Sequence, residues 1–261
     1  MKVKAIVLRA AGINCDLETE HALHLAGAEV ERIHINRIIE DKGLLRQFHI
    51  IVFPGGFSYG DDIAAGRILA NQVIHHLADS IRRFIDDGKL VLGICNGFQV
   101  LVKAGILPGN DQGGKQSSVT LTYNDSGRFE DRWVYLSPQT DRCVFVEKGR
   151  QIYLPIAHGE GKVVTDSPAS LGRLHKDGHV AFKYVDEKGA EGPYPVNPNG
   201  SADSVAGLTD TTGRVLGLMP HPERFVRLTQ HPRWSRMTKN DDADGMTIFN
   251  NAEKYIKANF S

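Results

Sequence analysis

A cysteine between two glycines is the strongest sign of chemistry in this chain. Cys95 follows the apolar run of residues 90–94 and forms a Gly-x-Cys-x-Gly pattern with Gly93 and Gly97. This pattern is typical of a nucleophile on a sharp strand-to-helix turn, where the neighbouring side chains must be small. The amino terminus of the next helix would stabilise a thiolate and offer backbone N–H groups to an oxyanion. The alternative is a buried cysteine between two packing glycines.

A thiol nucleophile needs a base, and the base usually lies far away in the sequence. Among 11 histidines, His221 is the candidate, because it ends an expected strand and precedes Glu223 by two residues. Residues i and i+2 of an extended segment project to the same side. The carboxylate can therefore hold one imidazole nitrogen and leave the other for Cys95. We predict a triad of these three residues, although His-Pro-Glu alone is more often a turn.

A glycine-rich segment is the third candidate part of the site. Gly55 and Gly56 follow the apolar run of residues 49–53, and glycines at the carboxyl end of a strand let the backbone approach a ligand closely. A backbone N–H group there could form an oxyanion hole together with the N–H group of Asn96. The alternative for this segment is an ordinary glycine turn.

The spacing of apolar residues predicts alternating strands and helices in the first hundred residues. Strands are expected at residues 4–8, 30–35, 49–53 and 89–94. Helices are expected at 16–24, with Asp16 as N-cap, at 68–85, with Ile74 on the apolar face, and at 96–103. Strands and helices joined by short connections indicate a parallel sheet with helices on both faces.

The remainder of the chain differs, because no long helix is expected between its strands. Strands are expected at residues 119–123, 133–136, 143–146, 151–156, 180–185, 205–208 and 214–219, and a closing helix at 247–260. These strands would extend the sheet by an antiparallel or mixed layer. We therefore predict an α/β fold with residues 1–261 as a single domain. Its sheet is expected to be open, mostly parallel and twisted, flanked by helices, with additional antiparallel strands.

Composition excludes several classes of protein. The chain has 261 residues, 41% of them hydrophobic, with 31 Lys plus Arg against 31 Asp plus Glu. A sizeable core is therefore possible, and a general nucleic-acid binder is disfavoured. No apolar run approaches the ~18 residues that a membrane span requires. The three cysteines, at positions 15, 95 and 143, lack metal-ligand spacing and an even disulfide count. We expect a cytoplasmic, thiol-reducing location, no bound metal and no membrane contact.

These motifs resemble those of the class I, or triad, glutamine amidotransferases. The resemblance rests on Gly-Ile-Cys-Asn-Gly-Phe-Gln at 93–99, Gly-Gly-Phe-Ser-Tyr-Gly-Asp at 55–61 and Met-Pro-His-Pro-Glu-Arg at 219–224. Within that class the chain is similar to the glutaminase subunits of phosphoribosylformylglycinamidine synthases. This narrower resemblance adds Asn-Cys-Asp at 14–16, Ala-His-Gly-Glu-Gly at 157–161 and Asn-Pro-Asn-Gly-Ser at 197–201.

The resemblance implies a flavodoxin-like architecture and the hydrolysis of L-glutamine. Cys95 would attack the side-chain carboxamide and form a glutamyl thioester, while His221 would transfer protons and Glu223 would orient it. Gly56 and Asn96 would supply the oxyanion hole. Glutamine-binding residues would be Gly55, Gln99, His158 and Glu160, with a purely structural role weighed equally for the segment around Glu160.

The resemblance also implies a partner. The ammonia would pass to a large ATP-using synthase subunit that converts formylglycinamide ribonucleotide to its amidine in purine biosynthesis, with a small third subunit as a further candidate. The chain has no Gly-x-x-x-x-Gly-Lys-Ser/Thr pattern for phosphate binding. ATP and Mg²⁺ are therefore expected on the large subunit, and no cofactor is expected on this chain.

Several alternatives stay open from the sequence. The chain could be an amidotransferase for another acceptor, a stand-alone cysteine hydrolase of the same fold, or a non-catalytic interaction protein. Cys15 fits a packing or pocket-wall residue better than a nucleophile. A basic stretch forms either a solvated loop or a surface for a partner or a phosphate; it comprises Arg224, Arg227, Arg233, Arg236 and Lys239.

Overall fold

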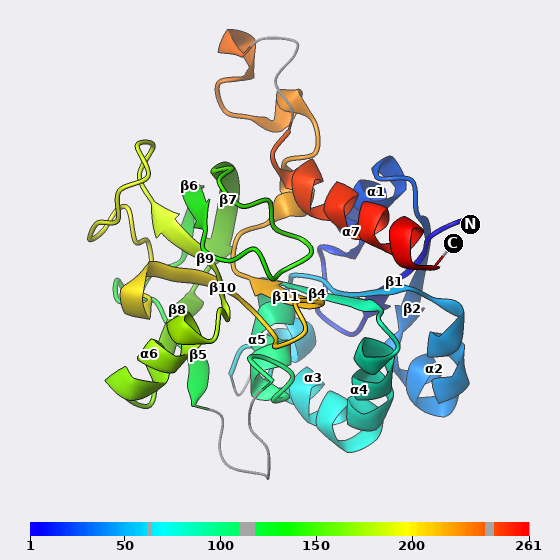
Figure 1. Cartoon of the computed structure of the whole chain (residues 1–261). Coiled ribbons are helices and arrows are strands. Elements are labelled where there is room, and N and C mark those ends of the chain that lie inside the picture. The colour runs from blue at the N-terminus through cyan, green and yellow to red at the C-terminus, as the bar shows by residue number, and fades with distance from the viewer. Residues whose placement is uncertain (62–63, 110–117, 238–242, 261) are drawn as a thin grey trace.

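The structure is a computed structural model, and it describes residues 1–61, 64–109, 118–237 and 243–260. The strands of its main sheet are β1 (Lys4–Arg9), β2 (Glu29–His34), β3 (Ile50–Phe53), β4 (Leu90–Ile94), β6 (Glu130–Pro138), β7 (Ile152–His158), β9 (Val180–Val185), β10 (Val205–Thr209) and β11 (Val215–Leu218). Across the sheet their order is β2-β1-β3-β4-β11-β10-β9-β6-β7 (Figure 1). A separate antiparallel pair consists of β5 (Val119–Tyr123) and β8 (Glu160–Thr165).

The main sheet has a parallel half and an antiparallel half. The first half consists of β2, β1, β3, β4 and β11, which run parallel to one another. From β11 onward, β10, β9, β6 and β7 continue the sheet with antiparallel pairings. Every residue of β3 and β4 is buried, as expected for parallel strands that are covered on both faces. The predicted fold class is confirmed, including its antiparallel extension.

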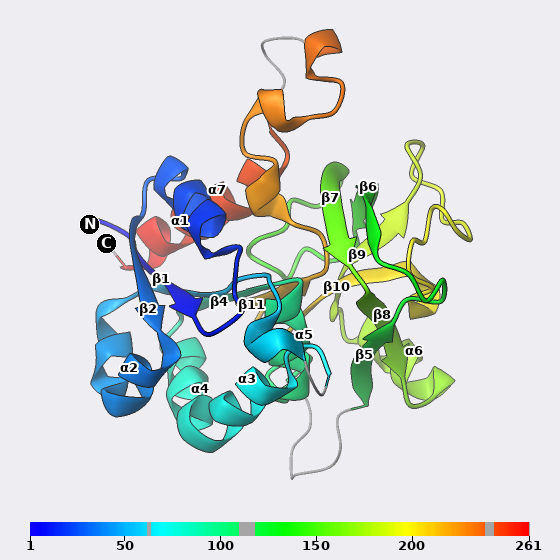
Figure 2. The ribbon, with the colours of Figure 1, turned by 180° about the vertical axis from the view of Figure 1, so that it is seen from behind.

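Helices cover both faces of the parallel strands (Figures 1 and 2). One face carries α1 (Asp16–Leu25) and α7 (Gly245–Phe260), and the other carries α3 (Arg67–Gln72), α4 (Ala78–Asp86) and α5 (Asn96–Lys103). α2 (Ile35–Glu40) packs beside β2, and α6 (Pro168–Lys176) packs beside β8. Short turns include η1 (Lys42–Gln47), η2 (Ser58–Asp61), η4 (Ala202–Ser204), η5 (Pro222–Arg224), η6 (Leu228–Gln230) and η7 (Trp234–Arg236).

The helix predicted at residues 68–85 differs from expectation in its middle. A π-helical turn, Val73–Leu77, separates α3 from α4. Such a turn takes in one residue more than an α-helical turn and rotates the following faces. Ile74, which was expected on the apolar face, is therefore 41% exposed, while Leu77 and Ile81 are buried.

Three further expectations need correction. The predicted strand at 143–146 is wrong: this segment forms turns, and its buried Phe145 offers its carbonyl oxygen to Asn251 instead of to a strand. The N-cap of α1 is Cys15, and Asp16 is the first helical residue. Three elements, α2, α6 and β8, were not predicted from the sequence, although Ser167 accepts a capping hydrogen bond before Pro168 and so marks the start of α6.

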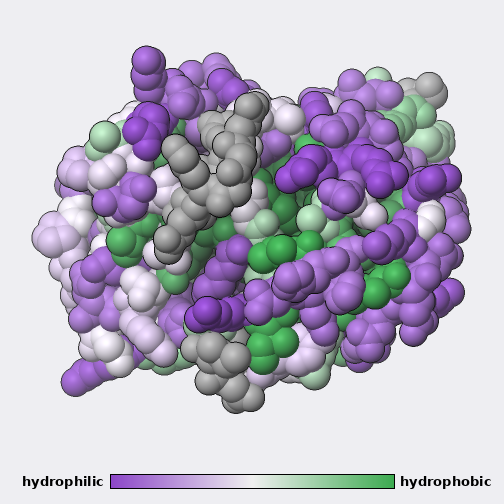
Figure 3. Space-filling model, turned by 90° about the horizontal axis from the view of Figure 1, so that it is seen from below, coloured by the Kyte–Doolittle hydropathy of each residue, from purple (hydrophilic) through white to green (hydrophobic). Residues whose placement is uncertain are grey.

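One segment stands apart from the body of the molecule. The chain from 232 to 237 projects away from the sheet, at the top of Figure 1, and its Trp234 is 54% exposed, whereas His231 just before it packs against Trp133 of β6 and Tyr153 of β7. The opposite, lower face is mostly hydrophilic, with hydrophobic side chains in patches near the middle of the view (Figure 3). Among the described residues, no helix combines the length and apolarity needed to cross a membrane.

Candidate active site

Cys95 occupies a strained turn between β4 and α5. Its backbone has φ of 51° and ψ of −104°, a conformation that residues other than glycine rarely adopt. The flanking glycines are required by close packing: a Cβ atom on Gly97 would collide with the carbonyl group of Phe53, and one on Gly93 would lie 2.8 Å from the carbonyl oxygen of Gly97. The expected sharp turn is present, but these contacts join the two glycines and β3 rather than involving Cys95.

His221 and Glu223 form a buried pair just beyond the end of β11. His221 is 2% exposed and Glu223 is 1% exposed. The imidazole Nδ1 and the carboxylate Oε1 are 2.7 Å apart. Because a carboxylate only accepts hydrogen bonds, Nδ1 carries the hydrogen and Nε2 keeps a lone pair. This Nε2 atom has no hydrogen-bond partner at normal geometry among the described residues.

The proton affinity of His221 is set by opposing effects. Burial alone would lower the pKa of the imidazole. The negative charge of Glu223, together with interactions with the Cys95 and Cys15 thiols, outweighs burial and raises this pKa well above its ordinary value. His221 can therefore hold a proton that it takes from a neighbouring thiol.

The glycine-rich loop after β3 is bound to the loop after β1. Gly56 has φ of 133° and pairs with Ile13 in an isolated bridge, and a Cβ atom on Gly56 would lie 2.7 Å from the backbone nitrogen of Asn14. The Phe57 N–H group donates to the carbonyl oxygen of Gly12 at 2.9 Å. Backbone contacts from two loops therefore hold Gly56 in its unusual conformation.

A cavity of about 200 Å³ opens onto Cys95. Pockets for drug-sized ligands are larger, roughly 300–1,000 Å³, so this cavity suits a small metabolite. It is lined by Gly56, Phe57, Ala65, Cys95, Gln99, Tyr123, Phe129, Ala157, His158, Gly159 and Glu160. Four of the residues predicted for the site lie outside this lining: His221, Glu223, Asn96 and Gly55. Gly55 instead packs against His221 and Cys15.

His158 is held as a neutral hydrogen-bond acceptor. Its Nδ1 lies 3.1 Å from the amide oxygen of Asn124, which also accepts from the Gly161 N–H group. Nδ1 therefore carries the hydrogen, and the buried Nε2 has no partner among the described residues. Burial and the nearby His221 lower the pKa of His158 to about 3. Asn124, which the sequence analysis did not single out, sets this tautomer.

Gln99 and Asn96 are engaged with the protein itself. The Gln99 side chain donates to the carbonyl oxygen of Glu160 and accepts from the Asn96 amide nitrogen at 3.1 Å. Asn96 in turn accepts from the Ser58 N–H group through Oδ1, at 3.3 Å. These bonds join α5 to β8 and to the glycine-rich loop. The Glu160 carboxylate accepts a long bond, 3.4 Å, from the Ala65 N–H group.

A cluster behind His221 contains possible metal donors. One ligand atom from each of Cys15, Glu18, His221 and Glu223 lies within 4.8 Å of the others. However, Arg224 donates to Glu18 Oε1 at 2.8 Å and to Cys15 Sγ at 3.2 Å. A metal ion would have to displace this guanidinium group, so we assign no metal to the cluster. Arg224 is also not part of a solvated loop, whereas Lys239 of the same basic stretch lies outside the described residues.

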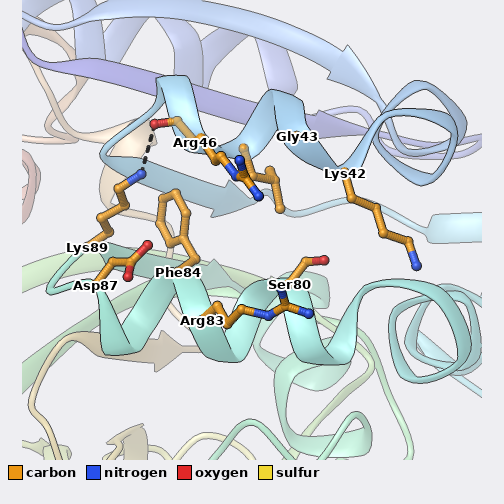
Figure 4. Close-up of a pocket in the computed structure, with 9 residues that line it drawn as sticks. Lys42, Gly43, Arg46, Ser80, Arg83, Phe84, Asp87 and Lys89 are labelled. Atoms are coloured by element: carbon orange, nitrogen blue, oxygen red, sulfur yellow. Dashed lines mark hydrogen bonds between the residues drawn. The ribbon is translucent and has the colours of Figure 1, made fainter.

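A second cavity, of about 310 Å³, lies at the other edge of the sheet, between η1 and α4 (Figure 4). Its charged lining residues are Lys42, Arg46, Arg83, Asp87 and Lys89. Lys89 is 8% exposed, and its Nζ donates to the Arg46 carbonyl oxygen at 3.0 Å. The other three cations are exposed and form no ion pair within the described part of the chain.

Comparisons with known proteins identify the family of this chain. Residues 2–256 match the family model of the CobB/CobQ-like glutamine amidotransferase domain. Phosphoribosylformylglycinamidine synthase subunit PurQ of Dehalococcoides mccartyi is 49% identical, over 98% of this chain and 98% of the relative. The subunit of the same name from Methanococcus maripaludis is 41% identical, over 97% of each chain.

Two solved structures resemble this chain to different degrees. A chain in the structure of PurLQS from Thermotoga maritima is 33% identical, with a TM-score of 0.74, over 98% of this chain and 100% of that one. A glutamine amidotransferase from Thermotoga maritima, 17% identical with a TM-score of 0.51, shows likeness of fold alone. This chain therefore belongs to the CobB/CobQ-like glutamine amidotransferases and, among them, to the family of phosphoribosylformylglycinamidine synthase subunit PurQ.

Proposed function

We propose that this chain is the glutaminase subunit of a phosphoribosylformylglycinamidine synthase, with Cys95 as its nucleophile. The observation that carries the assignment of the site is the position of Cys95. It lies on a strained turn, it borders a cavity of metabolite size, and it interacts with a buried His221–Glu223 pair. A thiol, an imidazole and an orienting carboxylate are the groups that nucleophilic hydrolysis of an amide requires.

The reaction divides into two acyl transfers. In the first, the Cys95 thiol gives its proton to Nε2 of His221, and the sulfur bonds to the side-chain carbonyl carbon of glutamine. N–H groups of Gly56 and Asn96 stabilise the resulting oxyanion. His221 then protonates the leaving nitrogen, the C–N bond breaks, and ammonia and a glutamyl thioester result. In the second, water attacks the thioester, and glutamate and the Cys95 thiol are released.

The cavity offers distinct groups to the rest of the glutamine molecule. Neutral His158 lines the cavity, and its Nε2 has no partner among the described residues; this atom is buried, so the ring must shift before Nε2 can accept from an N–H group of the substrate. The Glu160 carboxylate accepts one long hydrogen bond from the described residues, and its negative charge suits the α-ammonium group. Gln99 supports the cavity indirectly, because the oxygen and the nitrogen of its side-chain amide are both hydrogen-bonded to the protein. Gly55 supports His221 from outside the cavity.

The ammonia released here passes to a large synthase subunit, which binds ATP and Mg²⁺ and aminates formylglycinamide ribonucleotide. Support for this partner comes from the PurLQS assembly, in which the similar chain of Thermotoga maritima was solved. A small third subunit belongs to the same proposal. So does a cytoplasmic location, which is supported by three cysteines that are all free thiols.

A chloroketone analogue of glutamine tests the site directly. It should alkylate Cys95 and leave Cys15 and Cys143 unmodified, as peptide mass spectrometry would show. Cys15 and Cys143 serve as internal controls, because each is only 1% exposed and neither lines the cavity. Labelling of either control in place of Cys95, or labelling that excess glutamine does not slow, would contradict the assignment.

A further inference from the structure

The side of His221 that faces away from the cavity is packed against a polar cluster. Arg224 Nε donates to Glu18 Oε1 at 2.8 Å, and its Nη2 donates to Cys15 Sγ at 3.2 Å. The Cys15 thiol in turn donates to the amide oxygen of Asn14 at 3.3 Å. Cys15 is the N-cap of α1, and Arg224 ends η5. The cluster therefore ties the start of α1 to the turn that carries Glu223.

The Cys15 sulfur and the imidazole ring of His221 pack against the same residue, Gly55. A Cβ atom on Gly55 would lie 2.8 Å from His221 Cε1, 3.4 Å from His221 Nδ1 and 3.0 Å from Cys15 Sγ. The ring edge and the sulfur thus lie together beneath the Gly55 backbone. Because Cys15 is fully buried and held by Arg224, it limits how far the ring can tilt away from Cys95.

The buried negative charge of Glu223 requires a nearby cation, and the guanidinium group of Arg224 supplies one. The Glu223 carboxylate is 1% exposed, and its second oxygen, Oε2, has no hydrogen-bond partner among the described residues. A buried carboxylate in that condition requires nearby cations. Arg224, the next residue in the chain, interacts electrostatically with Glu223 and Cys15 as well as with Glu18. Although burial acts against its charged form, the hydrogen bond to Glu18 and the carboxylates of Glu18 and Glu223 raise the pKa of Arg224, so it stays protonated.

Titratable groups approach His221 from four of the segments around it. They are Glu223 and Arg224 of η5, Cys15 and Glu18 of α1, Cys95 before α5, and His158 of β7. His158 is neutral, because its pKa is about 3. Burial raises the pKa of the Cys15 thiol, so Cys15 is also uncharged at neutral pH. Arg224 is therefore the fixed cation of this environment, and Glu18 is its half-buried counter-ion.

We propose that Arg224 and Cys15 are positioning residues of the glutaminase centre. The guanidinium group keeps Glu223 ionised and aligned, and the Cys15 sulfur holds the imidazole edge so that Nε2 faces Cys95. This inference rests on the proposed function, in which His221 serves Cys95. Neither Arg224 nor Cys15 lines the cavity, so both act on the chemical step and not on the binding of glutamine.

The central test measures glutaminase kinetics against pH in the complex with the synthase subunit, for wild type, Arg224→Gln and Arg224→Lys. Loss of a cation makes protonation of nearby groups easier, so Arg224→Gln should move the acidic limb of kcat/KM upward by about one pH unit. Its kcat should fall about tenfold, with KM within about twofold. Arg224→Lys should restore the pH profile, because it returns the charge.

Two control variants separate charge from structure. Glu18→Gln removes the ion pair and an anion near His221 but keeps the Arg224 cation, so its pH profile should not move upward. Arg227→Gln changes an exposed arginine of the same basic stretch that contacts His21 instead of the triad, and it should match wild type throughout. For Cys15, alanine should lower kcat without a change in KM, and serine, which keeps an acceptor for the guanidinium group, should recover part of the loss.

A second readout does not depend on turnover. The rate at which iodoacetamide alkylates Cys95, mapped by peptide mass spectrometry, reports the reactive thiolate at each pH. This profile should shift upward in Arg224→Gln in parallel with the kinetic one. Two results for a folded Arg224→Gln protein would overturn the positioning role. One is that its kinetic and alkylation pH profiles are both those of wild type, and the other is that KM rises while kcat does not change. If Arg224→Gln does not fold, Glu18→Gln provides the test. An upward shift of about one pH unit in the acidic limb of its kcat/KM profile would overturn the positioning role of Arg224.

The proposed function fails in a different way. If wild type neither hydrolyses glutamine nor reacts at Cys95 with the glutamine analogue, the glutaminase assignment is wrong. A normal wild-type enzyme combined with an unshifted Arg224→Gln profile contradicts the positioning role alone.

Discussion

Two cavities lie at opposite edges of the same parallel strands, and they are built differently. At the carboxyl ends of β3, β4 and β11, the cavity beside Cys95 is backed by groups that are nearly all buried and bonded to one another. At the amino ends of β3 and β4, the second cavity is ringed by exposed cations, with only Lys89 buried and fixed (Figure 4).

The difference shows what positions a functional group. Each buried polar atom near Cys95 restricts its neighbours, since a wrong orientation would leave a desolvated donor or acceptor without a partner. The exposed arginines at the other edge have water as an alternative partner, so their orientations are weakly restricted. Substitutions at the first edge should therefore cause large, non-additive losses of activity or stability. Substitutions at the second edge should cause small losses that add independently.

Cys95→Ser should have the largest effect. Glutamine-dependent activity should fall by ~10³-fold or more, because a serine hydroxyl is a far weaker nucleophile at neutral pH. Free ammonia should still support the synthase reaction in the reconstituted complex, because the thiol serves only to release ammonia. Parallel assays with glutamine and with ammonium salts check both statements, and substantial glutamine-dependent turnover would contradict the role of Cys95.

His221→Ala should reduce kcat by about 10²–10⁴-fold, since it removes general acid–base catalysis. Glu223→Ala should cost less, because Glu223 orients the imidazole but does not itself transfer the proton. The double variant should lose little more than His221→Ala, since the pair acts as a unit. Steady-state kinetics of the three variants measure this coupling; a double-variant loss equal to the product of the single losses would show that the two residues act separately.

Stability should depend on pH through buried His158. Its pKa is about 3 in the folded protein, against 6.5 for an ordinary histidine. The folded pKa is the lower one, so the unfolded chain binds the proton first. The stabilisation is present in full above about pH 6.5 and is lost at about 1.4 kcal/mol per unit as the pH falls toward 3. Urea unfolding at pH 7 and pH 5 should show a smaller difference for His158→Gln than for wild type.

Gly55→Ala should reveal how tightly the catalytic edge is packed. The added Cβ atom would lie 2.8 Å from His221 Cε1 and 3.0 Å from Cys15 Sγ. Overpacking of this kind costs about 1–3 kcal/mol of unfolding free energy, and displacement of the imidazole should lower kcat as well. Gly172→Ala is the matched control: its Cβ meets nothing within 4 Å inside α6, so it should stabilise the protein by about 0.5–1 kcal/mol. A Gly55→Ala variant with wild-type stability and kcat would contradict the packing argument.

Arg83→Gln, in the second cavity, should have the smallest effect. Arg83 is exposed and has no ion-pair partner in the described ranges, so the free energy of unfolding should change by no more than about 0.5 kcal/mol. Glutaminase kcat/KM should equal that of wild type. A marked loss of glutaminase activity in this variant would show that the two edges of the sheet are coupled and that the second cavity does not act independently of the first.

Short-range patterns determined the parts of this protein in which neighbours in sequence act together. The Gly-x-Cys-x-Gly spacing predicted the turn at Cys95, because only glycine fits where α5 crosses β3 and β4. The His-x-Glu spacing predicted the contact between His221 and Glu223, which is 2.7 Å, although the expected extended geometry is wrong: the segment is the 3-10 turn η5, with His221 as its N-cap. The apolar runs likewise predicted most strands and their change from parallel to antiparallel pairing.

Only the tertiary structure decided what happens where distant segments meet. No spacing in the sequence relates Asn124 to His158, or Glu18 and Cys15 to Arg224, yet these contacts set a tautomer and surround the imidazole with charge. Likewise, the apolar period at 68–85 could not reveal the π-helical turn that exposes Ile74. The physical reason is that periodicity and spacing report local geometry, whereas burial, electrostatic coupling and hydrogen-bond partners depend on which surfaces the completed sheet and its helices bring together.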